Sequence, residues 1–169
     1  RERTNSKGIN FDIEQSSLLP ELIETDENKL KQILINLLGN AVKFTDTGGI
    51  LLRINSLELS DSKYLLTFSI IDSGVGIANN EQESVFNYFE QTSSGKHSQS
   101  GTGLGLAQVY GIIKQHDGFI DVQSHLGSGT TFTFYLPVQD VDMDHSTISE
   151  PSSMDGVGIP VLIVEDDRA

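Results

Sequence analysis

Residues 26–44 read DENKLKQILINLLGNAVKF, and this stretch decides the fold because it has the pattern of one long amphipathic helix. Thr25 or Asp26 can cap its first turn, and the sequence TDTGG at 45–49 ends it. The apolar residues recur at helical spacing, which predicts one buried face. These residues are Leu30, Ile33, Leu34, Leu37, Leu38 and Ala41.

The same helix carries a polar group of side chains, because Asn36, Asn40 and Lys43 lie at positions i, i+4 and i+7 and so share one face. An amide oxygen can ligate Mg²⁺, and a lysine ammonium can contact phosphate oxygens. A solvated helix face is the alternative explanation. Asparagine is a poor helix former, however, so two of them in one helix favour a function.

Strands are predicted on both sides of this helix from alternating apolar and polar residues. Their ranges are 8–15, 50–58, 64–72, 118–124 and 130–137. A second helix is predicted at 103–116. The segment that precedes it, 73–101, is long and rich in Gly and Ser, with one short helix candidate at 81–89. A connection of this length inside one domain is usually a functional lid or a disordered segment.

The composition of the 169 residues argues against several classes of function. The formal net charge of −13 disfavours a nucleic-acid-binding surface and contact with an anionic membrane. The chain has no cysteine, so neither disulfide bonds nor a cysteine metal site are possible. No apolar run approaches the roughly 18 residues of a membrane-spanning helix, and the opening RERTNSKG is not that of a signal peptide.

The stretch QSGTGLGLAQ at 99–108 places three glycines two residues apart, directly before the second predicted helix. The spacing differs from that of the dinucleotide fingerprint and of the GxxxxGK[ST] phosphate loop. Glycines let backbone N–H groups approach an anion closely, and the helix behind them adds donors and the positive end of its dipole. A structural turn before a helix is the alternative.

Two shorter motifs combine glycines with a polar side chain. In DSGVGI at 72–77, Asp72 at a strand end can accept a hydrogen bond from an exocyclic amine, and the glycines leave room for a flat ring. In GSGTTF at 127–132, Thr130 begins a strand close to wherever Asp72 lies. An ordinary turn can also explain each of these motifs.

Four motifs follow one another in the order N-x3-N-x2-K, D-x-G-x-G, G-x-G-L-G-L and G-x-G-T, with VFNYF between the second and the third. Over residues 8–137 the chain resembles the catalytic ATP-binding domain of sensor histidine kinases, within the superfamily of gyrase, Hsp90, histidine kinase and MutL-type ATPases. The resemblance implies an α+β fold. This fold is a two-layer α/β sandwich in which a mixed, mostly antiparallel sheet packs on about three helices and a long lid covers ATP.

The resemblance also implies roles for the polar residues. Asn40 would ligate a Mg²⁺ ion that bridges the phosphates of ATP, with Asn36 and Lys43 in support. Asp72 would bind the adenine amino group, and Thr130 would join it. The other residues assigned to the nucleotide or its lid are Phe44, Gly74, Gly76, Ile77, Phe86, Phe89, Lys96, Gly101, Thr102, Gly103, Leu104, Gly105 and Leu106.

The position of Asn36 bears on the chemistry. Hydrolysing members of the superfamily carry a glutamate, which acts as a base toward water, four residues before the metal-binding asparagine. Here Asn36 stands at that place, and an amide cannot take a proton. The resemblance therefore implies a site that presents the γ-phosphoryl group to a histidine outside it. None of the four histidines of the chain, His97, His116, His125 and His145, lies in the acceptor motif of the family.

We expect four parts along the chain. They are a remnant of the connection to missing dimerisation helices at 1–7, the catalytic domain at 8–138, a flexible acidic linker at 139–159 and the first strand of a truncated receiver domain at 160–169. The last part contains VLIVEDD, which resembles the first strand of response-regulator receivers, where Glu165 and Asp166 would bind Mg²⁺. The parent would then be a hybrid histidine kinase.

The predicted function is that of a protein-histidine kinase in two-component signalling, with ATP and Mg²⁺ bound. Its partners would be the dimerisation domain that carries the histidine and a receiver domain or response regulator. We expect a monomeric cytoplasmic domain from a homodimeric parent anchored in the cell membrane, without a nucleic-acid partner. Two alternatives remain open. One is an ATP-driven conformational clamp, and the other is a nucleotide- or partner-binding module without phosphotransfer.

Overall fold

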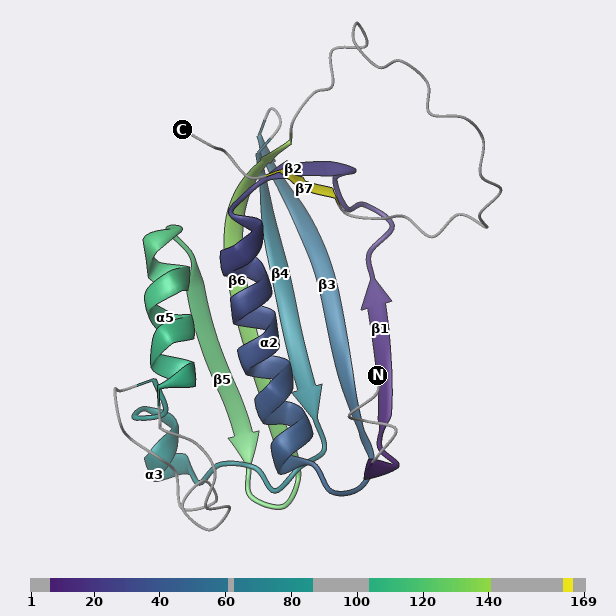
Figure 1. Ribbon diagram of the computed structural model, residues 1–169, viewed down its shortest axis with the longest axis vertical. Helices are drawn as coiled ribbons and strands as arrows, with labels where there is room; N and C mark the ends of the chain where they lie inside the picture. The colour runs from purple at the N-terminus through teal and green to yellow at the C-terminus, as the bar shows by residue number, and fades with distance from the viewer. Residues whose placement is uncertain (1–6, 61–62, 87–103, 141–162, 166–169) are drawn as a thin grey trace, which may run out of the picture.

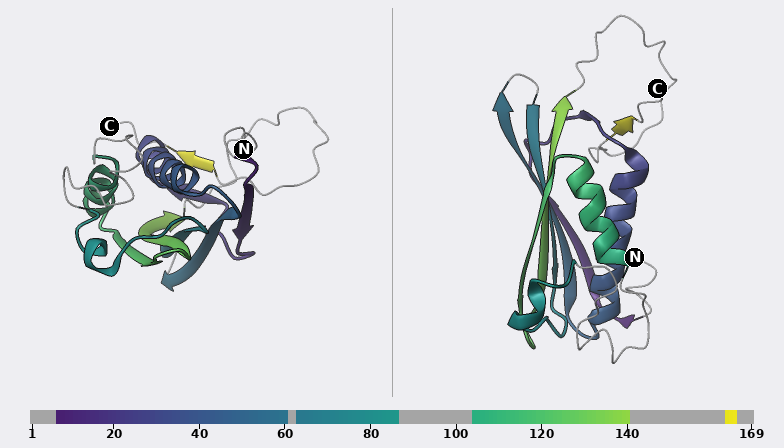
Figure 2. Two further views of the ribbon diagram at one scale, coloured as in Figure 1. Left: turned by 90° about the horizontal axis from the view of Figure 1, so that it is seen from below. Right: turned by 90° about the vertical axis from the view of Figure 1, so that its left-hand side faces the viewer.

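One mixed sheet forms a layer of the computed structural model, and helices cover one of its faces (Figures 1 and 2). The structure describes residues 7–60, 63–86, 104–140 and 163–165. The strands are β1 (Asn10–Gln15), β2 (Leu22–Glu24), β3 (Gly49–Ser60), β4 (Lys63–Asp72), β5 (Phe119–His125), β6 (Gly129–Asp140) and β7 (Ile163–Glu165). They lie in the order β1-β3-β4-β6-β2-β7, and β5 pairs with β6.

The pairing of the strands confirms the predicted sheet. β1 pairs with β3 and β2 with β7 in parallel, whereas β3–β4, β4–β6, β5–β6 and β2–β6 are antiparallel. β4 and β6 lie at the centre, and their pairing extends from Lys63 opposite Gln139 to Asp72 opposite Thr130. The last pair places the predicted aspartate and threonine side by side.

The helices of the described residues are α2 (Glu27–Phe44), α3 (Asn79–Gln82) and α5 (Gly105–Gln115). The long helix is confirmed, and Asp26 caps it, since its side chain accepts a hydrogen bond from the backbone N–H of Lys29 at 2.9 Å. α3 is shorter than the candidate at 81–89 and begins before it. None of these helices has the length and apolar composition that crossing a membrane requires.

The core lies between the sheet and the two longer helices, α2 and α5, which lie on the same face of the sheet (Figure 2). Phe68 of β4 and Phe134 of β6 stack with ring centroids 4.7 Å apart, and both side chains are buried. On α2, the apolar face is formed by buried Leu30, Ile33, Leu37 and Ala41 and by partly buried Leu34 and Leu38. Burying one large apolar side chain contributes roughly 1.5–3 kcal/mol, so this predicted face holds α2 on the sheet.

The edges of the sheet differ from the prediction. β1 pairs with β3 alone among the described strands, and this edge position leaves Ile13 51% exposed although Ile9 is buried. β2 was not predicted, because a three-residue strand carries no periodic pattern. β6 runs on to pair Gln139 and Asp140 with β2, so two residues of the predicted linker belong to the sheet.

The far C-terminal segment contributes β7, which pairs in parallel with β2. The prediction placed a strand in this part of the chain, and the structure has one at Ile163–Glu165. The rest of the predicted linker, 141–162, lies outside the described residues.

Candidate functional site

A pocket opens between the helical layer and the end of the sheet at which β4 ends and β6 begins. It encloses about 460 Å³, part of it open to solvent. The C-terminal end of α2 and the N-terminal end of α5 lie at this same end of the sheet (Figure 1). Of the predicted residues, the pocket brings together Asn40, Phe44, Asp72, Gly76, Ile77, Leu106 and Thr130, and Ala41, Val75, Val85 and Phe132 complete its lining.

Asp72 places a carboxylate in this largely apolar pocket. The residue ends β4 and is 8% exposed. Its Oδ1 accepts hydrogen bonds from the backbone N–H of Gly74 at 2.8 Å and of Thr130 at 3.3 Å. Burial raises the pKa of Asp72 above its ordinary value of 3.8, against the opposing effect of these two N–H groups. Oδ2 takes part in neither bond, so the carboxylate keeps acceptor capacity for a ligand.

Gly74 and Gly76 are required by the protein backbone. A Cβ on Gly74 would lie 2.4 Å from the carbonyl oxygen of Phe44, and one on Gly76 would lie 2.1 Å from that of His125. Gly76 also has a φ of +72°. Gly76 lines the pocket and Gly74 does not. The structure shows contacts of this turn with α2 and β5, and the assignment of both glycines to the packing of a flat ring stays a prediction.

The polar face of α2 points toward the same region. Asn40 lines the pocket, and Asn36 lies one turn earlier with Oδ1 3.7 Å from where a Cβ of Gly105 would be. Asn36 Nδ2 is buried and finds no hydrogen-bond partner among the described residues. A buried amide N–H without a hydrogen-bond partner costs free energy, so a ligand that brings an acceptor to Nδ2 would be stabilised here. Lys43, in the last turn of α2, places its Nζ 4.6 Å from the ring centroid of Phe44.

The remaining predicted residues fall into two groups. Leu104 directly precedes α5, Gly105 begins it, and Phe86 packs against Tyr110 and Phe132 with ring centroids 5.8 and 6.2 Å away. Phe89, Lys96, Gly101, Thr102 and Gly103 lie outside the described residues, so their assignments stay predictions.

Sequence reasoning missed Ser124, which connects the floor of the pocket to the turn after β4. Its Oγ lies 3.0 Å from Thr130 Oγ1 and accepts a hydrogen bond from the backbone N–H of Ile77 at 2.8 Å. Gln82 of α3 donates through Nε2 to the carbonyl oxygen of Ser124 at 2.8 Å. A signal was present, because Ser124 continues the inward-facing series of Ile120 and Val122 and is the polar member of that face.

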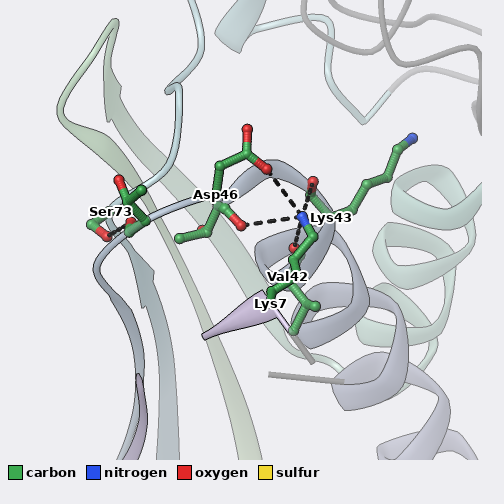
Figure 3. A network of polar contacts seen from close by, with 7 residues as sticks. Lys7, Val42, Lys43, Asp46 and Ser73 are labelled. Atoms are coloured by element: carbon green, nitrogen blue, oxygen red, sulfur yellow. Dashed lines mark hydrogen bonds and ion pairs between the residues drawn. The ribbon is translucent and has the colours of Figure 1, made fainter. Parts of the chain in front are cut away.

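Lys7 caps the C-terminal end of α2 (Figure 3). Its Nζ donates to the carbonyl oxygens of Val42 at 3.0 Å and of Lys43 and Thr45 at 3.2 Å each, and it pairs with Asp46 Oδ1 at 3.2 Å. A cation is favourable at the negative end of a helix dipole. The residue therefore holds the last turn of α2, which carries the site residues of that helix.

We expect Lys7→Met to lower the free energy of unfolding by about 1 kcal/mol, because it removes the cation and leaves three carbonyl groups without this donor. Urea denaturation measures the change. Lys63→Met, which removes an exposed lysine of β4, is the matched control. Equal effects of the two substitutions would contradict the capping role.

Thr45 offers a second test of stability. It is 0% exposed, and its Oγ1 has no hydrogen-bond partner among the described residues. We expect the nearly isosteric Thr45→Val to raise the free energy of unfolding by about 1 kcal/mol, because an unpaired buried hydroxyl is costly. Thr130→Val is the control that should lose stability, since Thr130 Oγ1 contacts Ser124. A destabilised Thr45→Val would show that the hydroxyl has a partner, such as a buried water.

Comparisons with known proteins match most of the chain to one family model. Residues 25–140 match the family model of histidine kinase-, DNA gyrase B-, and HSP90-like ATPases. The autoinducer 2 sensor kinase/phosphatase LuxQ of Vibrio vulnificus is 35% identical over 96% of this chain and 20% of its own length. The aerobic respiration control sensor protein ArcB of Shigella flexneri is 35% identical over 97% of this chain and 21% of its own. The chain thus spans about a fifth of these relatives.

Solved structures share the fold. Full-length ShkA in complex with AMPPNP superposes with a TM-score of 0.69 at 36% identity, covering 83% of this chain and 28% of that one. The nucleotide-free catalytic domain of the histidine kinase ThkA has a TM-score of 0.60 at 27% identity, covering 80% of this chain and 84% of that one.

Proposed function

This chain belongs to the family of histidine kinase-, DNA gyrase B- and HSP90-like ATPases as an ATP-binding catalytic domain of the histidine kinase kind, and we propose that it presents the γ-phosphoryl group of ATP to a histidine on another domain. The observation that carries the proposal is the buried carboxylate of Asp72 in an apolar pocket. An adenine amino group can donate a hydrogen bond to Asp72 Oδ2, and Phe44, Ile77 and Leu106 can make apolar contacts with the ring.

The phosphates would lie toward the polar face of α2 and the start of α5. The N-terminal N–H groups of a helix and its dipole favour an anion, and α5 begins beside Asn36. Nδ2 of Asn36, which has no partner within the part of the chain that the structure describes, is a donor that could bond to a phosphate oxygen. Lys43 would add a positive charge, and the glycine-rich stretch before α5 would add further N–H groups.

A magnesium ion fits the same residues. The described residues contain no group of three or more His, Cys, Asp or Glu side chains that could hold a metal. Mg²⁺ commonly keeps several waters and binds through few protein ligands together with substrate phosphates, so such a group is not needed. Asn40 would be the protein ligand, and the ion would neutralise charge on the phosphates.

The residues favour transfer to an external nucleophile over hydrolysis. Asn36 stands where a base would activate water, and its amide cannot take a proton. An imidazole nitrogen of the acceptor would attack the γ-phosphorus, a P–N bond would form, and the bond to the bridging oxygen would break to leave ADP. Neither His116 nor His125 lines the pocket, and His116 Nδ1 contacts the carbonyl oxygen of Ile112 at 2.8 Å. His97 and His145 lie outside the described residues, and none of the four histidines lies in the acceptor motif of the family, so we propose that another domain supplies the acceptor.

The partners follow from this chemistry. They would be a dimerisation domain that carries the histidine and a receiver domain or response regulator that takes the phosphoryl group onward. The resemblance of the C-terminal segment to a receiver strand supports a hybrid kinase, and the sensor names of the relatives support a sensory parent protein. The family resemblance supports a parent anchored in the membrane with this domain in the cytoplasm.

The experiment supplies the missing acceptor. The chain is mixed with the dimerisation domain of its parent and γ-labelled ATP, and acid-labile phosphohistidine is measured. At an ATP concentration near the wild-type dissociation constant, we expect transfer with the wild type and with Asp12→Asn, which changes an exposed carboxylate of β1, and strongly reduced transfer with Asp72→Asn. A wild-type chain that binds ADP but transfers nothing would be a nucleotide-binding module without phosphotransfer, and the kinase proposal would be wrong.

A further inference from the structure

Ser124 is a buried hydroxyl directly behind the pocket. It belongs to β5, is 4% exposed, and pairs with Thr130 across the β5–β6 ladder. Thr130 lines the pocket, whereas Ser124 does not. Any effect of Ser124 on a ligand must therefore pass through a neighbour.

The contacts of Ser124 determine where the hydrogen atoms lie. The backbone N–H of Ile77 donates to Ser124 Oγ at 2.8 Å, the carbonyl oxygen of Gly129 accepts from it at 2.8 Å, and Thr130 Oγ1 lies at 3.0 Å. A hydroxyl has one hydrogen and two lone pairs. Because Ser124 donates its hydrogen to Gly129, the hydrogen between the two hydroxyl groups comes from Thr130. This is the only arrangement in which all three contacts are hydrogen bonds.

Thr130 Oγ1 is thereby left with lone pairs alone on the side of the pocket. Asp72, its partner across the β4–β6 pair, is also an acceptor when ionised. Building on the proposed ATP site, we propose that Ser124 is a positioning residue that fixes Thr130 as a hydrogen-bond acceptor and so sets the preference for a 6-amino purine over a 6-oxo purine. The oxygen of a 6-oxo group is a hydrogen-bond acceptor, and it would face Thr130 Oγ1 and the Asp72 carboxylate, which are acceptors as well.

The surroundings hold Ser124 in this arrangement. Gln82 Nε2 donates to its carbonyl oxygen at 2.8 Å and to that of Ile77 at 3.2 Å, so α3 ties the end of β5 to the turn after β4. Reversing the hydrogen bond to Thr130 would leave Gly129 without the Ser124 donor. The direction of the bond is therefore built into the backbone contacts on both sides.

The test is the ratio of the dissociation constant of IDP to that of ADP, measured by calorimetry on the whole chain. Ser124→Ala releases the hydroxyl of Thr130, which can then donate to the 6-oxo group, so we expect the ratio to fall by roughly 3- to 10-fold. In a Thr130→Val background the same serine substitution is expected to leave the ratio unchanged. Ser69→Ala is the matched control, because Ser69 Oγ and Thr133 Oγ1 form a similar pair, 3.2 Å apart, on the face of the sheet opposite the pocket.

Two results would overturn the proposal. One is an unchanged ratio in a folded Ser124→Ala, and the other is an equal fall with and without the Thr130 hydroxyl, since the serine would then act through packing. If circular dichroism shows that Ser124→Ala does not fold, Ser124→Cys replaces it and is measured with and without Thr130→Val. A thiol has a similar volume to the hydroxyl group and is only a weak hydrogen-bonding group. Failure of the wild type to bind ADP would instead contradict the ATP site itself.

Discussion

Asp72→Asn is expected to weaken ADP binding by about 10- to 100-fold, because a hydrogen bond to a charged group contributes roughly 1.5–3 kcal/mol. The same substitution is expected to stabilise the nucleotide-free domain. An asparagine Oδ1 can keep the bonds from the N–H groups of Gly74 and Thr130, while the cost of burying a charge disappears. The gain should lie at roughly 0.5–2 kcal/mol, the usual range for a single stabilising substitution.

The pH dependence of this gain has a definite sign. Burial raises the pKa of Asp72 in the folded domain above 3.8, so the folded state holds the proton more tightly than the unfolded chain does. The contribution of Asp72 to stability therefore falls as the pH rises from the unfolded pKa through the folded pKa. The advantage of Asp72→Asn should be absent below both pKa values and complete above both.

Calorimetry with ADP and urea denaturation over a series of pH values measure the two effects. Asp12→Asn changes an exposed carboxylate on β1 and should alter neither quantity. If the variant binds ADP with the affinity of the wild type, the assignment of Asp72 to the adenine site is wrong. A variant that is less stable than the wild type at neutral pH would show that the folded domain favours the charged form.

Gly129→Ala is expected to destabilise the domain by about 3 kcal/mol or more. Gly129 has a φ of +106°, and a Cβ there would lie 1.9 Å from the carbonyl oxygen of Asp72. An unusual backbone conformation of this kind costs roughly 1–3 kcal/mol for a residue with a side chain, and the clash with a central strand adds to it. Because the strand end also positions Asp72 and Thr130, ADP binding should fall with stability.

Gly127→Ala in the same turn is the matched control. Gly127 has a φ of +78°, but a Cβ there would meet no atom within 4 Å. The conformational cost of about 1–2 kcal/mol is then the whole effect. Urea denaturation of the two variants separates the cost of the backbone conformation from the cost of the steric clash. Equal losses of stability would show that the close approach of Gly129 to β4 has no cost.

Much of the fold was predictable from local patterns. The helix at Glu27–Phe44, a cap at Thr25 or Asp26 and the buried face follow from a 3.6-residue period and from capping chemistry, which need only neighbouring residues, and the structure selects Asp26 as the cap. The central strands follow from alternation in the same way. The order and spacing of the four motifs were enough to predict the family, since each motif is a short stretch with its own chemistry.

Tertiary structure decided what depends on residues far apart in the chain. Thr130 donates its N–H to Asp72 from 58 positions away, and that contact, together with burial, determines the state of the carboxylate. Lys7 reaches carbonyl groups at the end of α2 across 35 to 38 positions. The motifs predicted that Thr130 lies close to Asp72 but not which groups form the hydrogen bond, and no period or motif encodes the contacts of Lys7. The direction of the hydrogen bond between Thr130 and Ser124 arises only when strand pairing and the turn at Ile77 surround one hydroxyl with a donor and an acceptor.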